Sequence, residues 1–326
     1  MSIPDEYLID DQTIDLIFDN MIRPAFYDSL TVKATAKPTT VYLGGQPGAG
    51  KSRTRAAIAE QYGEIAQIDP DVLRTFHPAF KTLEHDDPSH MAEYTNPFAG
   101  AMVDRSVAFC KKNGIDYIIE GTWRNPEAMA TWMKRDHDAG RKVHAVAMAV
   151  PPALSAASTE ARYFDARHKN SPARWTNIDY FSPLNRDMPD FVRAVACNRL
   201  TDRFTVADRT GLIPESDRRG NRTRLALPYW TTRFDRPLTV EEIGFCERVM
   251  DDAERMLAHD SPEYAESRRI RSMVEQAITL SRQASDGNGS ETVSFVPAST
   301  HAGLVWVNPY VRGDGTAVSG YWQDRS

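Results

Sequence analysis

Short apolar runs alternate with segments of helical spacing through the first two thirds of the chain. The apolar runs lie at residues 40–43, 65–68, 115–119 and 143–150. The last of them, VHAVAMAV, is typical of a central parallel strand. Helices are expected at about 51–61, 97–112, 125–139 and 155–169. Because strands that alternate with helices form right-handed βαβ units, the pattern predicts an α/β fold with a parallel sheet flanked by helices.

The segments around this core carry weaker patterns. Residues 1–38 place apolar side chains at roughly helical spacing, with Pro24 as an interruption, which indicates a helical lead-in. Residues 77–96 are rich in His, Asp, Pro and Asn, and we expect a loop over the sheet edge there. A helix at about 188–200 and a strand at 204–207 would complete the sheet, followed by a turn-rich connection at 208–221.

The last third of the chain predicts a separate arrangement. Thr239-Val240-Glu241-Glu242 is a capping box that opens an amphipathic helix, and Ser261-Pro262 opens another. Residues 284–290, ASDGNGS, have a linker composition, and residues 294–322 alternate apolar and polar residues around the hairpin signal RGDGT at 312–316. We therefore divide the chain into a lead-in (1–38), a core (39–236), a helical hairpin packed on the core (237–285) and a linker with a β-hairpin-like tail (286–326).

Composition narrows the classes of function. The 326 residues are 41% hydrophobic and 26% charged, with a net charge of −6, which argues against an extended nucleic-acid surface. Cys110, Cys197 and Cys246 are far apart and are interpreted as buried thiols of a reducing compartment. No signal peptide and no run of 18 apolar residues is present, so we expect a cytoplasmic protein without a membrane span. The histidines His77 and His85, like His90, lack a metal-ligand spacing and are interpreted as solvated loop residues.

The first strand leads into the most informative stretch, GQPGAGKS, which matches G-x-x-x-x-G-K-[ST] at every fixed position. Glycines there let successive backbone N–H groups turn toward a polyphosphate, and the following helix adds its positive end. The lysine supplies a charge to the outer phosphates and the serine hydroxyl can bind Mg²⁺. The pattern therefore predicts a site for a nucleoside triphosphate and Mg²⁺. The residues expected to bind ATP are Gly45, Gln46, Pro47, Gly48, Ala49, Gly50, Lys51, Ser52 and Arg53, with Ser52 also as metal ligand.

Two further strand ends carry polar side chains. Asp69 and Asp71 follow the second strand, at the sheet edge where such folds bind ligands. Asp71 could accept a proton from an attacking hydroxyl or could cap a helix, and Asp69 could orient magnesium through water or serve as a cap. At the end of the third strand, a carboxylate, a hydroxyl and a guanidinium occur within five residues, at Glu120, Thr122 and Arg124. This combination suits an anionic ligand that bears hydroxyl groups. Arg162 and Arg167 lie on a later helix, which could fold over the phosphates.

Together, the phosphate loop, Asp71 in IDPDVLR, the EGT-x-R segment and the later arginines resemble the zeta toxin family, P-loop kinases of bacterial toxin–antitoxin pairs. The resemblance implies that Lys51 and Ser52 bind ATP and Mg²⁺, that Asp71 is the catalytic base, and that Glu120, Thr122 and Arg124 bind the acceptor. It also implies that Arg162, and Arg174 in SPARW, lie near the γ-phosphate, with Arg167 as a competitor for the second position. Trp123 departs from the family's usual small residue and could stack on a base or ring.

The activity that the resemblance implies is transfer of the γ-phosphoryl group of ATP to the 3′-hydroxyl of the amino sugar in UDP-N-acetylglucosamine. It also implies inhibition by a small antitoxin protein that covers the ATP site. Another nucleotide acceptor, such as NAD or a polynucleotide end, is an alternative within the same chemistry. A non-catalytic ATP-dependent switch or binding module is the alternative from a different class, but the chain lacks the N-K-x-D segment of a GTP switch.

Overall fold

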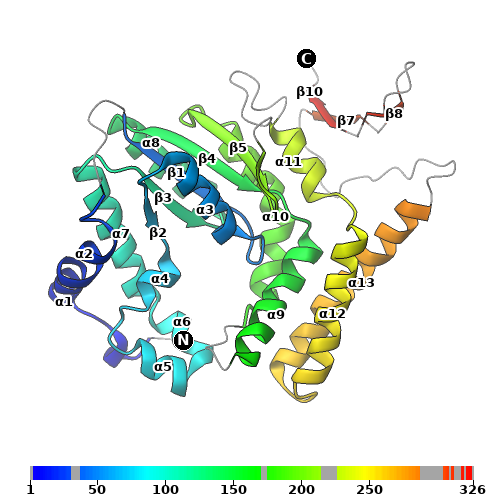
Figure 1. Cartoon of the computed structure of the whole chain (residues 1–326), viewed down its shortest axis with the longest axis horizontal. Coiled ribbons are helices and arrows are strands. Elements are labelled where there is room, and N and C mark those ends of the chain that lie inside the picture. Colours follow the sequence, from blue (N-terminus) through cyan, green and yellow to red (C-terminus); the bar gives the residue numbers. More distant parts are fainter. Residues whose placement is uncertain are drawn as a thin grey trace.

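A six-stranded sheet in the order β2-β3-β1-β4-β5-β6 lies at the centre of the molecule (Figure 1). Its strands are β1 (Thr39–Gly44), β2 (Ala66–Ile68), β3 (Tyr117–Gly121), β4 (Lys142–Met148), β5 (Arg203–Asp208) and β6 (Gly211–Ile213). The strands β1 to β5 are parallel, and β6 is antiparallel to β5. The predicted parallel α/β sheet is thereby confirmed, with β1 and β4 as its central strands.

The computed structural model describes residues 3–30, 37–169, 175–213 and 226–286, together with four short strands between residues 304 and 324. The helices that connect the strands of the sheet or follow them are α3 (Lys51–Tyr62), α4 (Pro70–Arg74), α7 (Asn96–Lys112), α8 (Pro126–Asp138), α9 (Pro152–His168) and α10 (Ile178–Ala196). Among the described helices, none is long and apolar enough to cross a bilayer.

Side chains of the central strand alternate between the two faces of the sheet, as the pleat requires. Val41 and Leu43 pack into one apolar cluster, whereas Tyr42 between them packs into another. Both faces are therefore covered, which explains why the central strands are apolar along nearly their whole length.

The capping box predicted at Thr239 is confirmed. The Thr239 hydroxyl accepts from the Glu242 N–H, and the Glu242 carboxylate accepts from the Thr239 N–H. It opens α12 (Val240–Met256), which forms a hairpin with α13 (Pro262–Asp286) alongside α9 (Figure 1). Apolar residues of both helices, such as Val249 and Val274, belong to the same cluster as Val41 and Leu43 of β1.

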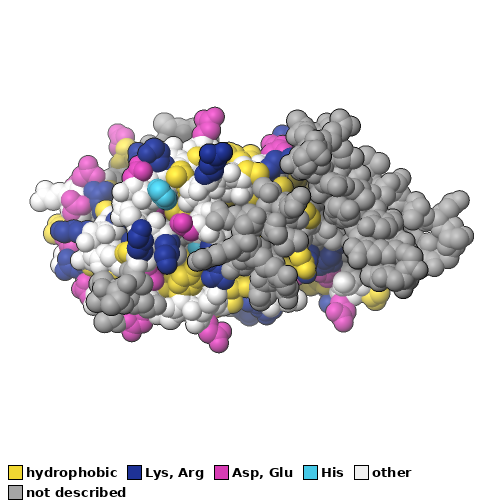
Figure 2. Space-filling model, turned by 90° about the horizontal axis from the view of Figure 1, so that it is seen from above, with side chains coloured by type: hydrophobic (Ala, Val, Ile, Leu, Met, Phe, Trp, Pro, Cys, Tyr) yellow, Lys and Arg dark blue, Asp and Glu magenta, His cyan; other side chains and the backbone are white. Residues whose placement is uncertain are grey.

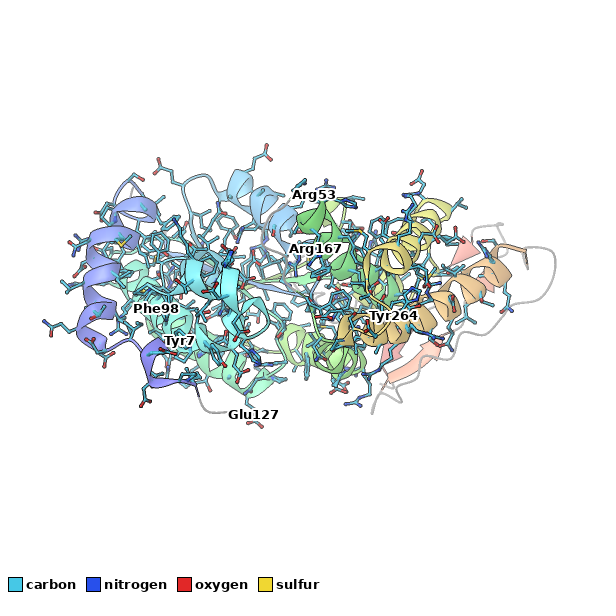
Figure 3. All side chains as sticks on the ribbon, turned by 90° about the horizontal axis from the view of Figure 1, so that it is seen from below. Tyr7, Arg53, Phe98, Glu127, Arg167 and Tyr264 are labelled. Atoms are coloured by element: carbon cyan, nitrogen blue, oxygen red, sulfur yellow. The ribbon has the colours of Figure 1, made fainter. Side chains whose placement is uncertain are left out.

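The N-terminal elements cover the opposite end of the molecule. They are η1 (Asp5–Tyr7), α1 (Asp11–Ile17), η2 (Phe18–Ile22) and α2 (Arg23–Phe26), with a π-helical turn in η2. Phe18 and Ile22 pack against α7 in a third apolar cluster. Figure 3 shows Tyr7 and Phe98 at this end, far from Tyr264 in the helical hairpin.

The loop predicted at 77–96 is wrong, because this stretch forms α5 (Phe80–Asp86) and α6 (Pro88–Tyr94). Its turn-forming residues serve as helix starts instead: Asp87 accepts from the His90 N–H, and Pro88 occupies the first turn of α6. The solvated environment expected for His77 is also wrong. This side chain is buried, its Nδ1 accepts from the Ala79 N–H, and its Nε2 lies 3.1 Å from the Tyr7 carbonyl oxygen.

Three other expectations need correction. The helix expected at 188–200 is α10, which begins at Ile178 because buried residues at helical spacing continue through Pro183 and Pro189. The connection expected at 208–221 contains β6, while residues 214–221 lie outside the described part, and α11 (Leu227–Phe234) follows unpredicted. Cys197 is exposed rather than buried, since it lies just beyond the end of α10.

In the tail, β7 (Leu304–Val307) pairs with β10 (Tyr321–Asp324), and β8 (Tyr310–Val311) pairs with β9 (Ala317–Val318), both antiparallel. The chain therefore reverses between β8 and β9, where the hairpin signal was noted, although residues 312–316 themselves lie outside the described part. The division of the chain into four domains stays a prediction.

Candidate active site

The loop between β1 and α3 has the backbone geometry of a phosphate cradle. Gly48 and Gly50 adopt φ angles of 76° and 93°, and Gly50 forms the N-cap of α3. A Cβ at Gly48 would lie 2.1 Å from the Ser155 carbonyl oxygen. Glycine is therefore needed at position 48 both for the left-handed backbone and for the close approach of α9.

Lys51 is held at the first position of α3. Its Nζ donates to the carbonyl oxygens of Gly45 at 2.9 Å and Gln46 at 3.1 Å. Burial lowers its pKa to about 8, against the opposing charge of Glu120, while the charge of Arg162 lowers it further. The carboxylates of Asp71 and Asp69 also act on this ammonium group. Charged groups from β3, from α4 and its N-cap, and from α9 therefore act on Lys51.

Asp69 and Asp71 have different environments. Asp69 is the N-cap of α4 and accepts from the Asp71 N–H at 2.9 Å, so of the two acids it is Asp69 that caps the helix. Asp71 lies in the first turn with its side chain 62% exposed, and its Oδ1 is 3.7 Å from Nε of Arg74. Arg74 is buried and donates to the Ala92 carbonyl and to Thr95 Oγ1, both at 2.6 Å.

Glu120 lies near the carboxyl end of β3 with its side chain largely buried. Burial raises its pKa above the ordinary value, and the nearby Arg55 opposes this effect. Nη1 of Arg55 is 2.9 Å from Glu120 Oε1 and also contacts the Asp69 carboxylate. Arg55 was missed in the sequence, although its position four residues after Lys51 places both side chains on one face of α3.

Thr122 and Arg124 follow β3, the first half-buried and the second exposed. Trp123 between them is only 3% exposed and packs against Gly44, where an added Cβ would lie 2.1 Å from the indole ring. Its φ of 55° is the one positive value of a non-glycine residue in the described chain. The indole therefore belongs to the core, and the stacking of Trp123 on a ligand ring that the sequence suggested is wrong.

The arginines of α9 face different surroundings. Arg162 is exposed and its charge acts on Lys51, whereas Arg167 has its guanidinium 6.0 Å from the centre of the Tyr163 ring. Arg174, the other candidate for the second position, lies outside the described residues. The helix itself is joined to the phosphate loop, because Ser155 Oγ donates to the Pro47 carbonyl at 2.8 Å.

Arg209, in the turn between β5 and β6, is a second residue that sequence reasoning missed. Its Nη2 donates to the Gly48 carbonyl at 2.9 Å and to Ser158 Oγ, and its guanidinium lies 5.8 Å from the centre of the Phe245 ring. Its own carbonyl accepts from Arg53 at 3.3 Å. Arg209 thus links the phosphate loop to α9 and to α12.

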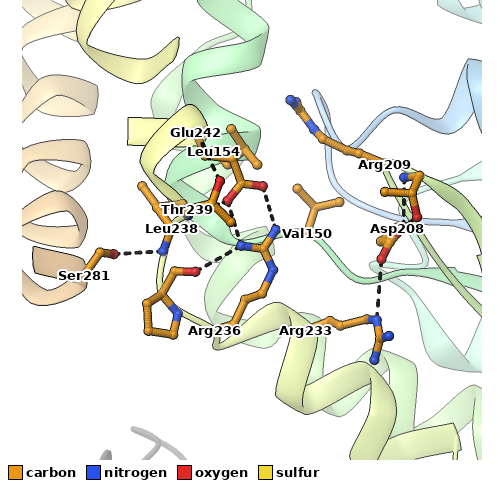
Figure 4. Close-up of polar contacts among 12 residues, drawn as sticks. Val150, Leu154, Asp208, Arg209, Arg233, Arg236, Leu238, Thr239, Glu242 and Ser281 are labelled. Carbon is orange, nitrogen blue, oxygen red and sulfur yellow. Dashed lines mark hydrogen bonds and ion pairs between the residues drawn. The ribbon is translucent and has the colours of Figure 1, made fainter. Parts of the chain in front are cut away.

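A network of ion pairs surrounds this turn (Figure 4). Arg236 pairs with both carboxylate oxygens of Glu242 at 2.6 Å, and Arg233 lies 3.4 Å from Asp208. Arg233 of α11 therefore pairs with the end of β5, next to Arg209, while Arg236 pairs with the first turn of α12. No signal in the sequence alone indicated the contact between Arg233 and Asp208, because these residues lie in segments far apart in the chain.

The chain combines a parallel sheet, a phosphate loop that leads from β1 into α3, and acids at the ends of the neighbouring strands β2 and β3. These features define a P-loop fold of the kinase type. The family model described as zeta toxin matches residues 25–218, more than half of the chain. The chain therefore belongs to the zeta toxin family, and the resemblance seen in the sequence is confirmed.

Individual relatives agree with this assignment. The chain is 34% identical over 188 residues to toxin zeta of Enterococcus hirae, which covers 56% of this chain and 60% of the relative. It is 33% identical over 132 residues to toxin PezT of Streptococcus pneumoniae, which covers 40% of this chain and 52% of the relative. The chain thus matches only about half of these relatives' own length.

A solved structure from the PezAT chromosomal toxin–antitoxin system of Streptococcus pneumoniae has the same fold. Its TM-score is 0.64 at 23% identity, and the match covers 78% of this chain and 98% of that chain. At this identity the likeness shows the fold alone.

Proposed function

We propose that this protein is an ATP-dependent kinase that phosphorylates the 3′-hydroxyl of the amino sugar in UDP-N-acetylglucosamine. The observation that carries this proposal is that the charges of Asp71, Glu120 and Arg162 act on the half-buried Lys51. A cation for phosphates, a carboxylate exposed enough to meet a hydroxyl, and a second cation on a facing helix are the parts that phosphoryl transfer needs.

In the proposed reaction, Asp71 takes the proton from the acceptor hydroxyl while the oxygen bonds to the γ-phosphorus. The bond from that phosphorus to the β–γ bridging oxygen breaks, and ADP leaves with the electron pair. Lys51 and Arg162 stabilise the charge that develops on the transferring group, and Arg174 would add to this. Glu120, Thr122 and Arg124 hold the acceptor in line.

ATP would be bound by the loop residues 45–53, whose inward-turned N–H groups and helix start suit a polyphosphate. Mg²⁺ fits the chemistry of this region, because Ser52, next to Lys51 at the start of α3, offers a hydroxyl oxygen. When bound, the ion would neutralise part of the negative charge on the phosphates. Among the described residues, no group of three or more His, Cys, Asp or Glu side chains gathers as a metal site.

The identity of the acceptor is inferred from family membership and from the EGT-x-R segment. NAD and a polynucleotide end are the alternatives. The burial of Trp123 removes the side chain that suggested base stacking. Positive and negative side chains are interspersed on the face shown in Figure 2, which gives no support to a long nucleic acid. A small antitoxin partner and a cytoplasmic location belong to the same proposal, as the PezAT system pairs a toxin with an antitoxin.

The test is an assay with ATP, Mg²⁺ and UDP-N-acetylglucosamine that follows the nucleotide sugar by mass spectrometry. We expect the wild type to add one phosphate. We expect Asp71→Asn to lower kcat by about 10²- to 10⁴-fold, the range for loss of a general base. Asp104→Asn, on the exposed side of α7, is the matched control and should retain full activity.

The alternatives give different results. ATP consumption only with NAD or with a polynucleotide end would overturn the acceptor and keep the kinase. ATP binding without turnover of any acceptor would overturn the kinase and favour a binding module or switch.

A further inference from the structure

Arg55 occupies the junction between the proposed ATP side and acceptor side of the site. It lies one helical turn after Lys51 on α3, and its Nη1 lies 2.9 Å from Glu120 Oε1 while also contacting Asp69 Oδ2. The side chains of Arg55, Glu120 and Asp69 are only 16%, 12% and 19% exposed. One guanidinium nitrogen is therefore shared by carboxylates from the ends of two adjacent strands.

The guanidinium compensates the negative charge of both carboxylates. Two largely buried carboxylates at neighbouring strand ends repel each other, and burial alone favours the neutral form of each. Oε1 of Glu120 is buried and makes no hydrogen bond within the described residues, so its compensation is the ion pair with Arg55. Removal of one partner of such a buried pair leaves an uncompensated charge.

Asp69 transmits the position of Arg55 to the proposed base. Its Oδ2 contacts Arg55, while its Oδ1 accepts from the Asp71 N–H at 2.9 Å and so caps α4. Asp71 lies in the first turn of that helix. A shift of Asp69 would therefore move the backbone that carries Asp71.

We propose that Arg55 is the positioning residue that fixes both acceptor-side groups, Glu120 directly and Asp71 through Asp69, relative to Lys51. This inference rests on the proposed kinase function. Arg55 is rigidly spaced from the phosphate loop because it shares α3 with Lys51, so it sets the distance between phosphate donor and acceptor. It acts on the reaction through other residues and need not touch ATP or the acceptor.

The charged groups that face Glu120 come from several elements. They are Lys51 and Arg55 of α3, Asp69 after β2, and Asp71 of α4. In Arg55→Met, one cation is lost while both acids remain. Glu120 should then hold its proton to higher pH, and the acid limb of the activity profile should move to higher pH.

The experiment compares wild type, Arg55→Met and Arg55→Lys with ATP and whichever acceptor the wild type uses. For Arg55→Met we expect kcat/KM for the acceptor to fall about 100-fold, as for a misplaced reacting group. We expect the acid limb to move up by about one pH unit. The dissociation constant for ATP, measured by calorimetry, should change less than about threefold, since the loop and Lys51 are intact. Arg55→Lys keeps the charge and should restore the acid limb and part of the activity.

A second readout does not depend on turnover. Carboxyl-carbon NMR, with the Glu120 signal assigned through Glu120→Gln, should show Glu120 titrating at higher pH in Arg55→Met than in wild type. Arg105→Met is the matched control, because Arg105 also bridges two carboxylates, Asp15 at 2.8 Å and Asp11 at 3.1 Å, at the N-terminal end of the molecule. It should leave the activity, the pH profile and the Glu120 titration unchanged.

An unchanged Glu120 titration together with an unchanged acid limb would overturn the inference. So would a loss of ATP affinity as large as the loss of activity, because Arg55 would then support the phosphate loop. If the wild type turns over no acceptor, the proposed function fails, and the NMR titration still decides whether Arg55 controls Glu120.

Discussion

At the scale of single residues, the charge of Lys51 is the property that the site controls most directly. Burial lowers its pKa to about 8 in the free protein, so near pH 8 a sizeable fraction of the side chain is uncharged. ATP phosphates favour the ammonium form and raise its pKa. Binding of ATP above pH 8 therefore requires uptake of a proton.

We expect the contribution of Lys51 to the affinity for ATP to be constant below about pH 7 and to fall as the pH rises above 8, by up to tenfold per unit. Calorimetry at pH 8.5 in two buffers of different ionisation enthalpy should show proton uptake by the protein. Binding at pH 8.5 without proton uptake would contradict the lowered pKa. Lys142→Met, with the exposed lysine at the start of β4, is the control and should keep the proton uptake.

Residue types and spacing predicted much of the candidate site, and tertiary contacts decided the rest. The phosphate loop could be predicted because its glycines and Lys51 act through local backbone geometry. The burial of Trp123 could not be predicted, because it depends on the absence of a side chain at Gly44 on the distant strand β1. Arg55 and Arg209 were missed for the same reason, since their partners come from distant segments. The roles of the site residues stay predictions.

At the scale of elements, α9 joins the site to the helical hairpin. One side of this helix approaches the phosphate loop through Ser155, and another carries Glu160, which is buried against α13. Ser267 hydrogen-bonds the Glu160 carboxyl group and the charge of Arg271 acts on it. Oε1 of Glu160 has no hydrogen-bond partner among the described residues. The contact between α9 and the hairpin therefore contains a buried carboxyl group, that of Glu160, whose ionised form is only partly stabilised by its neighbours.

This acid should make stability depend on pH. Burial raises the pKa of Glu160 from 4.5 to about 7, so the folded protein holds the proton more tightly than the unfolded chain does. The free energy of unfolding should therefore fall as the pH rises from about 4.5 to 7, by about 1.4 kcal/mol per unit for this group. We expect Glu160→Gln to lack this contribution to the pH dependence of the unfolding free energy.

Other acids also titrate in this range, so the measurement is the difference in unfolding free energy between Glu160→Gln and wild type. Urea denaturation should show that this difference changes in favour of the variant by about 2 to 3 kcal/mol between pH 5 and 7.5. Glu241→Gln, at an exposed position in the first turn of α12, should show no such change. A pH-independent difference for Glu160→Gln would contradict the raised pKa.

Elements with strong periodicity were predicted well, and those that begin with turn-forming residues were not. The strands β1 to β5 and the helices α7, α8 and α12 follow their patterns closely. In contrast, Asp87 and Pro88 indicated a loop because the same residues favour turns and helix starts. Whether α5 and α6 form depends on what they pack against, and a single sequence does not reveal that.

At the scale of the whole molecule, the helical hairpin and the sheet share one apolar cluster. Ile243 and Val249 of α12 belong to the same cluster as Val41 and Leu43 of β1. This continuity predicts that the hairpin does not unfold alone, because its separation would expose the apolar face of the sheet.

The cysteines can test this prediction. Cys246 is buried in the hairpin, Cys110 is buried at the other end of the molecule, and Cys197 is exposed. Burial raises the pKa of the Cys246 thiol to about 11 and that of Cys110 to about 12, so both should react with thiol reagents only after the protein opens. In Cys197→Ser, we expect both to be labelled with the same dependence on urea, as one cooperative unit. Mass spectrometry of peptides after short labelling pulses would follow each site separately. If Cys246 were labelled at urea concentrations that leave Cys110 protected, the hairpin would open independently, and its shared cluster with the sheet would contribute little to cooperativity.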